Sequence, residues 1–122
     1  MSEERAVALL STVGLQELLG RFSLGDTAEW GELLSGGQKQ RLSWCRLYFH
    51  NPRFALVDEA TSAISSDMVH HLYDHAKRLG ITLVSISHQP EIDQHHEMAL
   101  DLDRSGGFSF GPLAEVEDNE LM

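Results

Sequence analysis

The sequence predicts an α/β fold in which helices flank a parallel sheet. Three short apolar runs, at 54–57, 81–86 and 98–102, have the length and composition of buried strands. Helical patterns alternate with the first two, which is typical of parallel sheets. After the third run, residues 108–110 are expected to pair back across a Gly-Gly turn.

The helices are predicted from apolar periodicity and from residues that begin or end them. Residues 3–13 start with acidic side chains and continue with apolar ones at helical spacing, and a short helix is expected over 15–22. A loop rich in Gly and Asp follows at 23–31. Longer helices are predicted over 36–49, ended by an Asn-Pro pair, and over 65–79, ended by a glycine.

Polar side chains follow the first two predicted strands. Asp58 and Glu59 close the run 54–57, and His88 comes shortly after the run 81–86. In open parallel sheets ligands bind at the carboxyl ends of the strands. These three side chains are therefore expected at one ligand-binding edge.

Composition limits the class of protein. The chain has 122 residues, enough for one small domain with a modest core, and a net charge of −10. That charge argues against a nucleic-acid partner and against charge-driven binding to anionic lipid. No apolar run approaches the roughly 18 residues of a membrane helix, and the start lacks a secretory signal. The chain alone is expected to be soluble.

Two further features concern cysteine and the C-terminal residues. Cys45 is the only cysteine, which excludes an intrachain disulfide, fits a reducing compartment and predicts a packing role. Acidic residues crowd the end of the chain, so residues 114–122 are predicted to form a solvated, disordered tail. These acidic residues are Glu115, Glu117, Asp118 and Glu120.

The chemistry of the strand ends favours phosphate hydrolysis. An aspartate after a buried strand can hold Mg²⁺, and a neighbouring glutamate can orient or deprotonate a water molecule. Asp58 and Glu59 have this order, and His88 could contact a γ-phosphate. An acidic pair that merely starts a turn remains the alternative for the two carboxylates taken alone.

The segment 34–41, LSGGQKQR, predicts a loop that contacts phosphate. Gly36 and Gly37 let backbone N–H groups approach an anion, and the helix that follows adds its positive N-terminal end. Ser35 can add a hydroxyl group. An ordinary Gly-Gly turn before a helix is an equally good interpretation of this loop alone.

Taken together, these residues resemble the ATP-binding cassette (ABC) ATPase family over residues 30–90. LSGGQ at 34–38 is similar to the family's signature motif, and 54–58 is similar to its Walker B strand. Glu59 matches the catalytic glutamate, 61–65 the D-loop and His88 the switch histidine. Gln40, Arg41, Arg46 and Pro52 also fit the signature helix and its exit.

The resemblance is narrower still, to subfamily D, the peroxisomal fatty-acyl transporters, over residues 15–110. The segment DEATSAIS has Ser65 where most ABC proteins have Asp in the D-loop, and Trp30 precedes the signature. The resemblance implies import of long-chain or very-long-chain fatty acids or their CoA esters into peroxisomes. It also implies a location at the cytosolic face of the peroxisomal membrane.

The chain has no P-loop of the form G-x-x-x-x-G-K-[ST]. The nearest match, at 20–27, places Asp26 at the lysine position, where it would repel phosphate, and no strand precedes it. The resemblance thus implies an incomplete P-loop NTPase fold: the C-terminal part of an ABC ATPase domain at 1–113. Residues 1–50 would form the helical signature region, and 51–113 the α/β region. Such a part is expected to expose core surface and to be marginally stable alone.

The resemblance implies a dimer of modules with shared ATP and Mg²⁺ sites. The signature residues Ser35, Gly36, Gly37 and Gln38 would cover ATP held by the partner module. On the chain's own side, Asp58 would place Mg²⁺, Glu59 would activate water and His88 would contact the γ-phosphate. A transmembrane domain is expected in the full-length protein.

Alternatives remain open. The same motifs occur in soluble ABC ATPases of DNA repair and chromosome maintenance, and the chain could be a truncated, non-catalytic partner of a complete module. His71 and His75, four residues apart on a predicted helix, could share a metal ion, although a solvated helix face is the simpler interpretation.

Overall fold

The computed structural model describes residues 2–114. The acidic tail expected at 114–122 therefore lies, except for Ala114, outside the described residues. The chain divides into two compact units, Met1–His88 and Gln89–Met122. Each unit is described by itself below.

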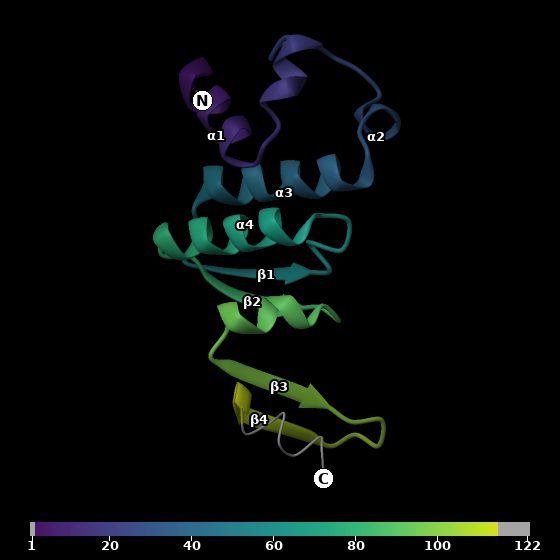
Figure 1. Cartoon of the computed structure of the whole chain (residues 1–122), viewed down its shortest axis with the longest axis vertical. Helices are drawn as coiled ribbons and strands as arrows, with labels where there is room; N and C mark the ends of the chain where they lie inside the picture. Colours follow the sequence, from purple (N-terminus) through teal and green to yellow (C-terminus); the bar gives the residue numbers. More distant parts are fainter. Residues whose placement is uncertain (1, 115–122) are drawn as a thin grey trace. The chain divides into compact units, whose positions relative to one another are not determined.

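The first unit contains most of the helices (Figure 1). They are α1 (Glu3–Thr12), the 3₁₀ helix η1 (Gln16–Gly20), α2 (Trp30–Leu33), α3 (Gly36–His50) and α4 (Ser66–Arg78). The predictions for α1, α3 and α4 are confirmed to within one or two residues. Two predictions at 15–31 are wrong in detail: the helix expected at 15–22 is a shorter 3₁₀ helix, and the last two residues of the expected loop at 23–31 already belong to α2. Trp30 begins α2 and packs edge-on against Phe22, with ring centroids 4.9 Å apart.

The first sheet pairs β1 (Phe54–Asp58) with β2 (Thr82–Ile86) in parallel, as predicted. In Figure 1, α3 and α4 lie on one side of these strands. Side chains of the opposite face are exposed, including Leu56 (68%) and Val84 (57%), which are partners in the register. The strands predicted to be buried thus have one exposed face in the described residues, which agrees with the expectation that this part of a domain exposes core surface.

The core of this unit lies between α3, α4 and the covered face of the sheet. Trp44 and Tyr48 on α3 are each 2% exposed, and Leu72 on α4 is fully buried. The Tyr48 hydroxyl donates to the Leu72 carbonyl at 2.7 Å, and burial raises the pKa of this phenol. The Tyr73 ring meets the Trp44 ring edge-on, and its hydroxyl lies 2.9 Å from the Ser85 hydroxyl on β2. These contacts join both helices to the sheet.

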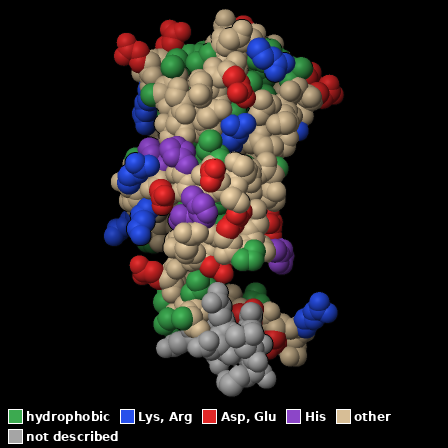
Figure 2. Space-filling view, in the orientation of Figure 1, with side chains coloured by type: hydrophobic (Ala, Val, Ile, Leu, Met, Phe, Trp, Pro, Cys, Tyr) green, Lys and Arg blue, Asp and Glu red, His purple; other side chains and the backbone are tan. Residues whose placement is uncertain are grey.

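The histidines of α4 take part in packing. His71 Nε2 lies 2.8 Å from the Thr12 carbonyl oxygen, and the His75 ring packs edge-on against Tyr48. Figure 2 shows histidine side chains beside lysine and arginine side chains over this helix. Among residues 2–114, no group of three or more His, Cys, Asp or Glu side chains could hold a metal ion. His71 and His75 therefore contact other parts of the chain and do not simply form a solvated face.

The second unit contains the 3₁₀ helix η2 (Pro90–His95), β3 (Met98–Leu102) and β4 (Phe108–Pro112). The two strands pair antiparallel, with Leu102 opposite Phe108, which confirms the predicted hairpin. Asp103 shapes the turn, because its Oδ1 accepts hydrogen bonds from the N–H groups of Ser105 and Gly107. Within 2–114, none of the helices combines the length and the apolar character that crossing a membrane requires.

Candidate functional site

The ends of β1 and β2 bring the predicted hydrolytic side chains together. Asp58 is the last residue of β1 and pairs with Ile86, the last residue of β2. Glu59 Oε1 lies 3.8 Å from His88 Nε2. The His88 side chain is 98% exposed and that of Glu59 is 39% exposed, so both are open to a ligand. The parallel register thus places the three predicted residues at one edge.

The backbone of Glu59 has an unusual conformation. Its φ of 50° lies in the left-handed region, which costs a non-glycine residue about 1–3 kcal/mol. Two hydrogen bonds hold the peptide groups on either side of the Glu59 Cα atom. The Glu59 N–H donates to the Ile86 carbonyl at 2.8 Å, and the Gln40 side chain donates to the Glu59 carbonyl at 3.1 Å. Strained residues of this kind concentrate at functional sites because the surrounding structure must hold them.

Asp58 has the chemistry to contribute to a Mg²⁺ site. Its carboxylate is exposed at the end of β1, and Mg²⁺ prefers oxygen ligands. Nucleotide-bound Mg²⁺ keeps several waters and takes only one or two protein carboxylates. The absence of a larger ligand cluster within 2–114 is therefore compatible with this role. Asp58 fits as one ligand that is shared with substrate phosphates.

The signature segment begins α3 with a capping box. The Ser35 hydroxyl accepts from the Gln38 N–H at 3.1 Å, and the Gln38 side-chain oxygen accepts from the Ser35 N–H at 2.9 Å. This reciprocal pair ends the extended segment and starts the helix. The first N–H groups of the helix, which include those of Gly36 and Gly37, have no acceptor within the helix and can face an anion.

The first turn of α3 lies close to the segment that follows Glu59. A Cβ atom on Gly37 would lie 2.6 Å from the Ala63 carbonyl oxygen, whereas one on Gly36 would lie 3.7 Å from the Ala63 Cβ atom. Glycine at 37 is thus required by close packing, while 36 has room for a methyl group. The same signature residue that can face an anion also contacts the predicted D-loop of its own chain.

Replacing Gly37 with Ala is expected to destabilise the domain by about 1–3 kcal/mol, because a methyl group would press against backbone atoms. The matched variant Gly36→Ala adds the same methyl group at ordinary van der Waals distance from Ala63 and should be close to neutral. Denaturant unfolding of the complete nucleotide-binding domain measures both. Equal stability of the two variants would contradict the close approach of α3 and Ala63.

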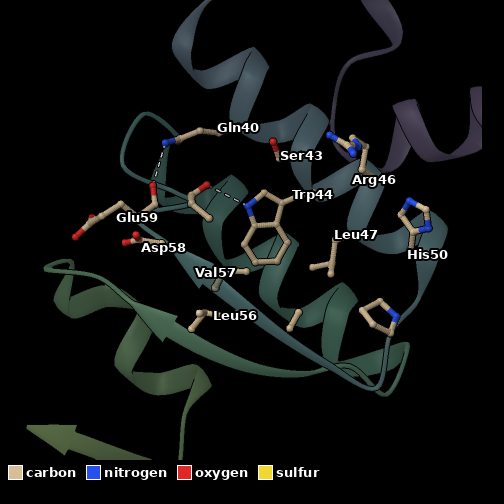
Figure 3. A pocket seen from close by; sticks show the side chains of 13 residues that line it. Gln40, Ser43, Trp44, Arg46, Leu47, His50, Leu56, Val57, Asp58 and Glu59 are labelled. Carbon is tan, nitrogen blue, oxygen red and sulfur yellow. Dashed lines mark hydrogen bonds between the residues drawn. The ribbon is translucent and has the colours of Figure 1, made fainter.

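A pocket of about 520 Å³ lies between α3 and β1 and ends at the predicted site. Figure 3 shows Gln40 and Trp44 pointing from α3 toward the segment after β1. The Trp44 Nε1 group donates to the Ala60 carbonyl at 3.1 Å. Neither residue was predicted to touch this segment. Gly37, Gln40 and Trp44 are spaced three and four residues apart, which places them on one face of α3. The sequence did not show what this face contacts.

The fold is that of ATPase domains of the ABC type. A bacterial Atm1-family ABC exporter, solved with ATP bound, matches the chain with a TM-score of 0.80 and 26% sequence identity. The match covers 98% of the present chain and 22% of the exporter chain. The predicted fold class, a part of an ABC-type P-loop NTPase, is confirmed.

The chain belongs to the ABC transporter family, whose sequence model matches residues 1–62. It is 37% identical over 120 residues to "ATP-binding cassette sub-family D member 1" of Drosophila melanogaster, a match that covers 98% of the chain and 16% of that relative. It is 38% identical over 116 residues to "ATP-binding cassette sub-family D member 3" of Rattus norvegicus, covering 94% and 18%.

The name of a third relative states a different substrate. The chain is 36% identical over 109 residues to "Lysosomal cobalamin transporter ABCD4" of Mus musculus, with 87% of the chain and 18% of that relative covered. The chain thus spans less than a fifth of the length of these relatives. The resemblance to subfamily D is confirmed, while the substrate is not fixed by it.

Proposed function

We propose that the chain forms the C-terminal part of an ATP-hydrolysing domain in an ABC transporter. The observation that carries this proposal is the Glu59–His88 contact of 3.8 Å beside Asp58, at the common end of two parallel strands. A structural acidic turn would not require a left-handed glutamate that is held by two hydrogen bonds. A carboxylate that could serve as base, a candidate metal ligand and a polar side chain at one edge support phosphate hydrolysis as the reaction.

Each residue has a distinct part in the proposed reaction. The Asp58 carboxylate would hold Mg²⁺, which when bound neutralises phosphate charge. The Glu59 carboxylate would orient the attacking water and accept its proton, with an effect in the range of general base catalysis. His88 would donate a hydrogen bond to the γ-phosphate. Their exposure leaves this edge accessible to a nucleotide that is held by a P-loop.

The signature residues would act on the nucleotide of a second module. Ser35, Gly36, Gly37 and Gln38 begin α3, whose first N–H groups and positive N-terminal end suit the phosphates of ATP. A dimer in which each module covers the ATP of the other would complete both sites. The full-length protein would add a transmembrane domain through which hydrolysis drives transport.

The proposed cargo is a long-chain or very-long-chain fatty acid or its CoA ester, imported into peroxisomes. The similarity to sub-family D members 1 and 3 supports this choice, and the lysosomal cobalamin transporter is the competing relative. Peroxisomal β-oxidation in cells that lack their own subfamily D transporters provides a test. Expression of the full-length protein should restore it, whereas rescue of lysosomal cobalamin export alone would favour the other cargo.

ATP hydrolysis by the chain, alone and joined to the upstream half of a subfamily D nucleotide-binding domain, tests the proposed activity. We expect no hydrolysis by the chain alone, because the 122 residues contain no P-loop, and clear hydrolysis by the joined protein. The Glu59→Gln form of the joined protein is the control for contaminating ATPases. An inactive joined protein that still binds ATP would refute the catalytic assignment.

A second candidate function is a non-catalytic partner of a complete ABC module. The capped signature segment at the start of α3 supports it, because these residues alone could cover the ATP of a complete module. In this case the chain mixed with a complete module would change the partner's hydrolysis, and Glu59→Gln in the chain would have no effect. A soluble DNA-repair ATPase is less well supported, because the matching family model is that of ABC transporters and one relative described above is named as a transporter.

A further inference from the structure

We propose that Gln40 is a positioning residue for Glu59 during ATP hydrolysis, an inference that rests on the proposed function. The Gln40 side chain makes three hydrogen bonds to the segment after β1. Its Nε2 group donates to the Glu59 carbonyl at 3.1 Å and to the Ser62 hydroxyl at 2.8 Å. Its Oε1 atom accepts from the Ala63 N–H at 2.9 Å.

These bonds act on a backbone that needs support. Glu59 has a φ of 50°, which is unfavourable for a residue with a Cβ atom. The Ile86 carbonyl anchors its N–H group at the end of β2, so Gln40 supplies the second anchor, at the carbonyl group. A change in the backbone torsion angles of Glu59 would move its carboxylate away from His88 and from the attacking water.

Gln40 also ties this backbone to the helix that carries the signature. The residue lies in the second turn of α3, as Figure 3 shows, with its amide directed at the Glu59 carbonyl. Two further contacts reinforce this connection: Gly37 packs against the Ala63 carbonyl, and Trp44 donates to the Ala60 carbonyl. The direction of the Glu59 side chain is therefore set by α3 as well as by β1.

A purely structural role for Gln40 makes a different prediction. Three hydrogen bonds could simply stabilise the turn, and their loss would then lower stability and nucleotide binding together. A positioning role predicts a selective loss in the chemical step, because misplacing the base by about 1 Å lowers the rate without weakening substrate binding. The kinetic parameters kcat and KM separate these roles.

The test uses the full-length transporter with Gln40→Ala, Gln40→Glu and the matched control Ser43→Ala. Glu at position 40 keeps the size of the side chain and can accept from the Ala63 N–H, but it cannot donate to the Glu59 carbonyl. Ser43 lines the same pocket, and its hydroxyl donates to the Lys39 carbonyl within α3. We expect both Gln40 variants to lower kcat by roughly 10- to 100-fold with KM for ATP nearly unchanged, and Ser43→Ala to retain wild-type kcat.

A double variant completes the experiment. Adding Gln40→Ala to Glu59→Gln should cause no further loss of turnover, because the base that Gln40 positions is already absent. A further loss, a rise in KM with kcat unchanged, or unfolding of both Gln40 variants would overturn the inference. If Glu59→Gln itself retained full hydrolysis, the proposed function would fail. If only the Gln40 variants retained kcat, the positioning role alone would fail.

Discussion

Replacing Glu59 with Gln in the complete transporter is expected to abolish most ATP hydrolysis while leaving ATP binding intact. The amide keeps the size and polarity of the side chain but cannot accept a proton from water. General base catalysis contributes about 10²- to 10⁴-fold, and kcat should fall by a factor in this range. Steady-state hydrolysis gives kcat, and equilibrium binding of labelled ATP gives the affinity.

A distant glutamate provides the matched control for this variant. Glu17 is an exposed residue of η1, and Glu17→Gln makes the same chemical change away from the strand ends. It should leave kcat and ATP affinity unchanged. Near-normal hydrolysis by Glu59→Gln would refute its role as base, and loss of ATP binding would assign it to nucleotide binding instead.

Replacing Trp44 with Ala is expected to cause the largest loss of stability, about 3–5 kcal/mol in the free energy of unfolding. Trp44 is 2% exposed and packs against Tyr48 and Tyr73, between α3 and α4. Truncation would leave a cavity where these helices meet. It would also remove the hydrogen bond to the Ala60 carbonyl next to Glu59.

The second tryptophan offers a matched comparison. Trp30 is only partly buried at the start of α2, so Trp30→Ala should cost clearly less than Trp44→Ala. Trp44→Phe keeps part of the packing but removes the indole N–H and some ring volume, so its loss should be smaller than that of Trp44→Ala. Denaturant unfolding of the complete domain, followed by circular dichroism, measures all three. Equal losses at the two tryptophans would contradict the core described here.

Most elements could be predicted because their boundaries have local causes. The Asn-Pro pair predicted the end of α3, and the helix does end at Asn51, which adopts a left-handed conformation. Gly80, with a φ of 78°, follows the end of α4 in the same way. The juxtaposition of Glu59 and His88 also followed from sequence, because both residues come after strands of one parallel sheet.

Other features could not be predicted, because they depend on what each element contacts. Nothing in the apolar runs shows that the Leu56 and Val84 face is exposed while the other face is covered. In the same way, helical spacing places Gln40 and Trp44 on one face of α3 but gives no partner for it. Their contacts with residues 59–63 depend on the tertiary packing of β1 against α3, which the sequence pattern does not give.

These contacts bear on how two ATP sites could communicate. The helix that begins with the signature residues holds the backbone of Glu59 through Gln40. In the proposed dimer, α3 would thus touch the partner's ATP at one end and position the base for its own ATP along its side. Ser65 gives the D-loop a hydroxyl in place of a carboxylate, so coupling through charge is expected to be weaker at that position.

The central claim, that the signature residues serve the partner's ATP while Glu59 serves the chain's own, can be tested with mixed dimers of the full-length protein. One dimer carries Ser35→Arg and Glu59→Gln in the same copy, and another carries them in opposite copies. If the claim holds, Ser35→Arg damages the ATP site of the partner copy, and Glu59→Gln damages the site of its own copy. With both substitutions in one copy, each of the two sites is damaged once. With the substitutions in opposite copies, both fall on one site and the other site stays intact. Single-turnover hydrolysis of bound ATP should therefore disappear in the first dimer and persist at one site in the second. The reverse pattern would contradict the account.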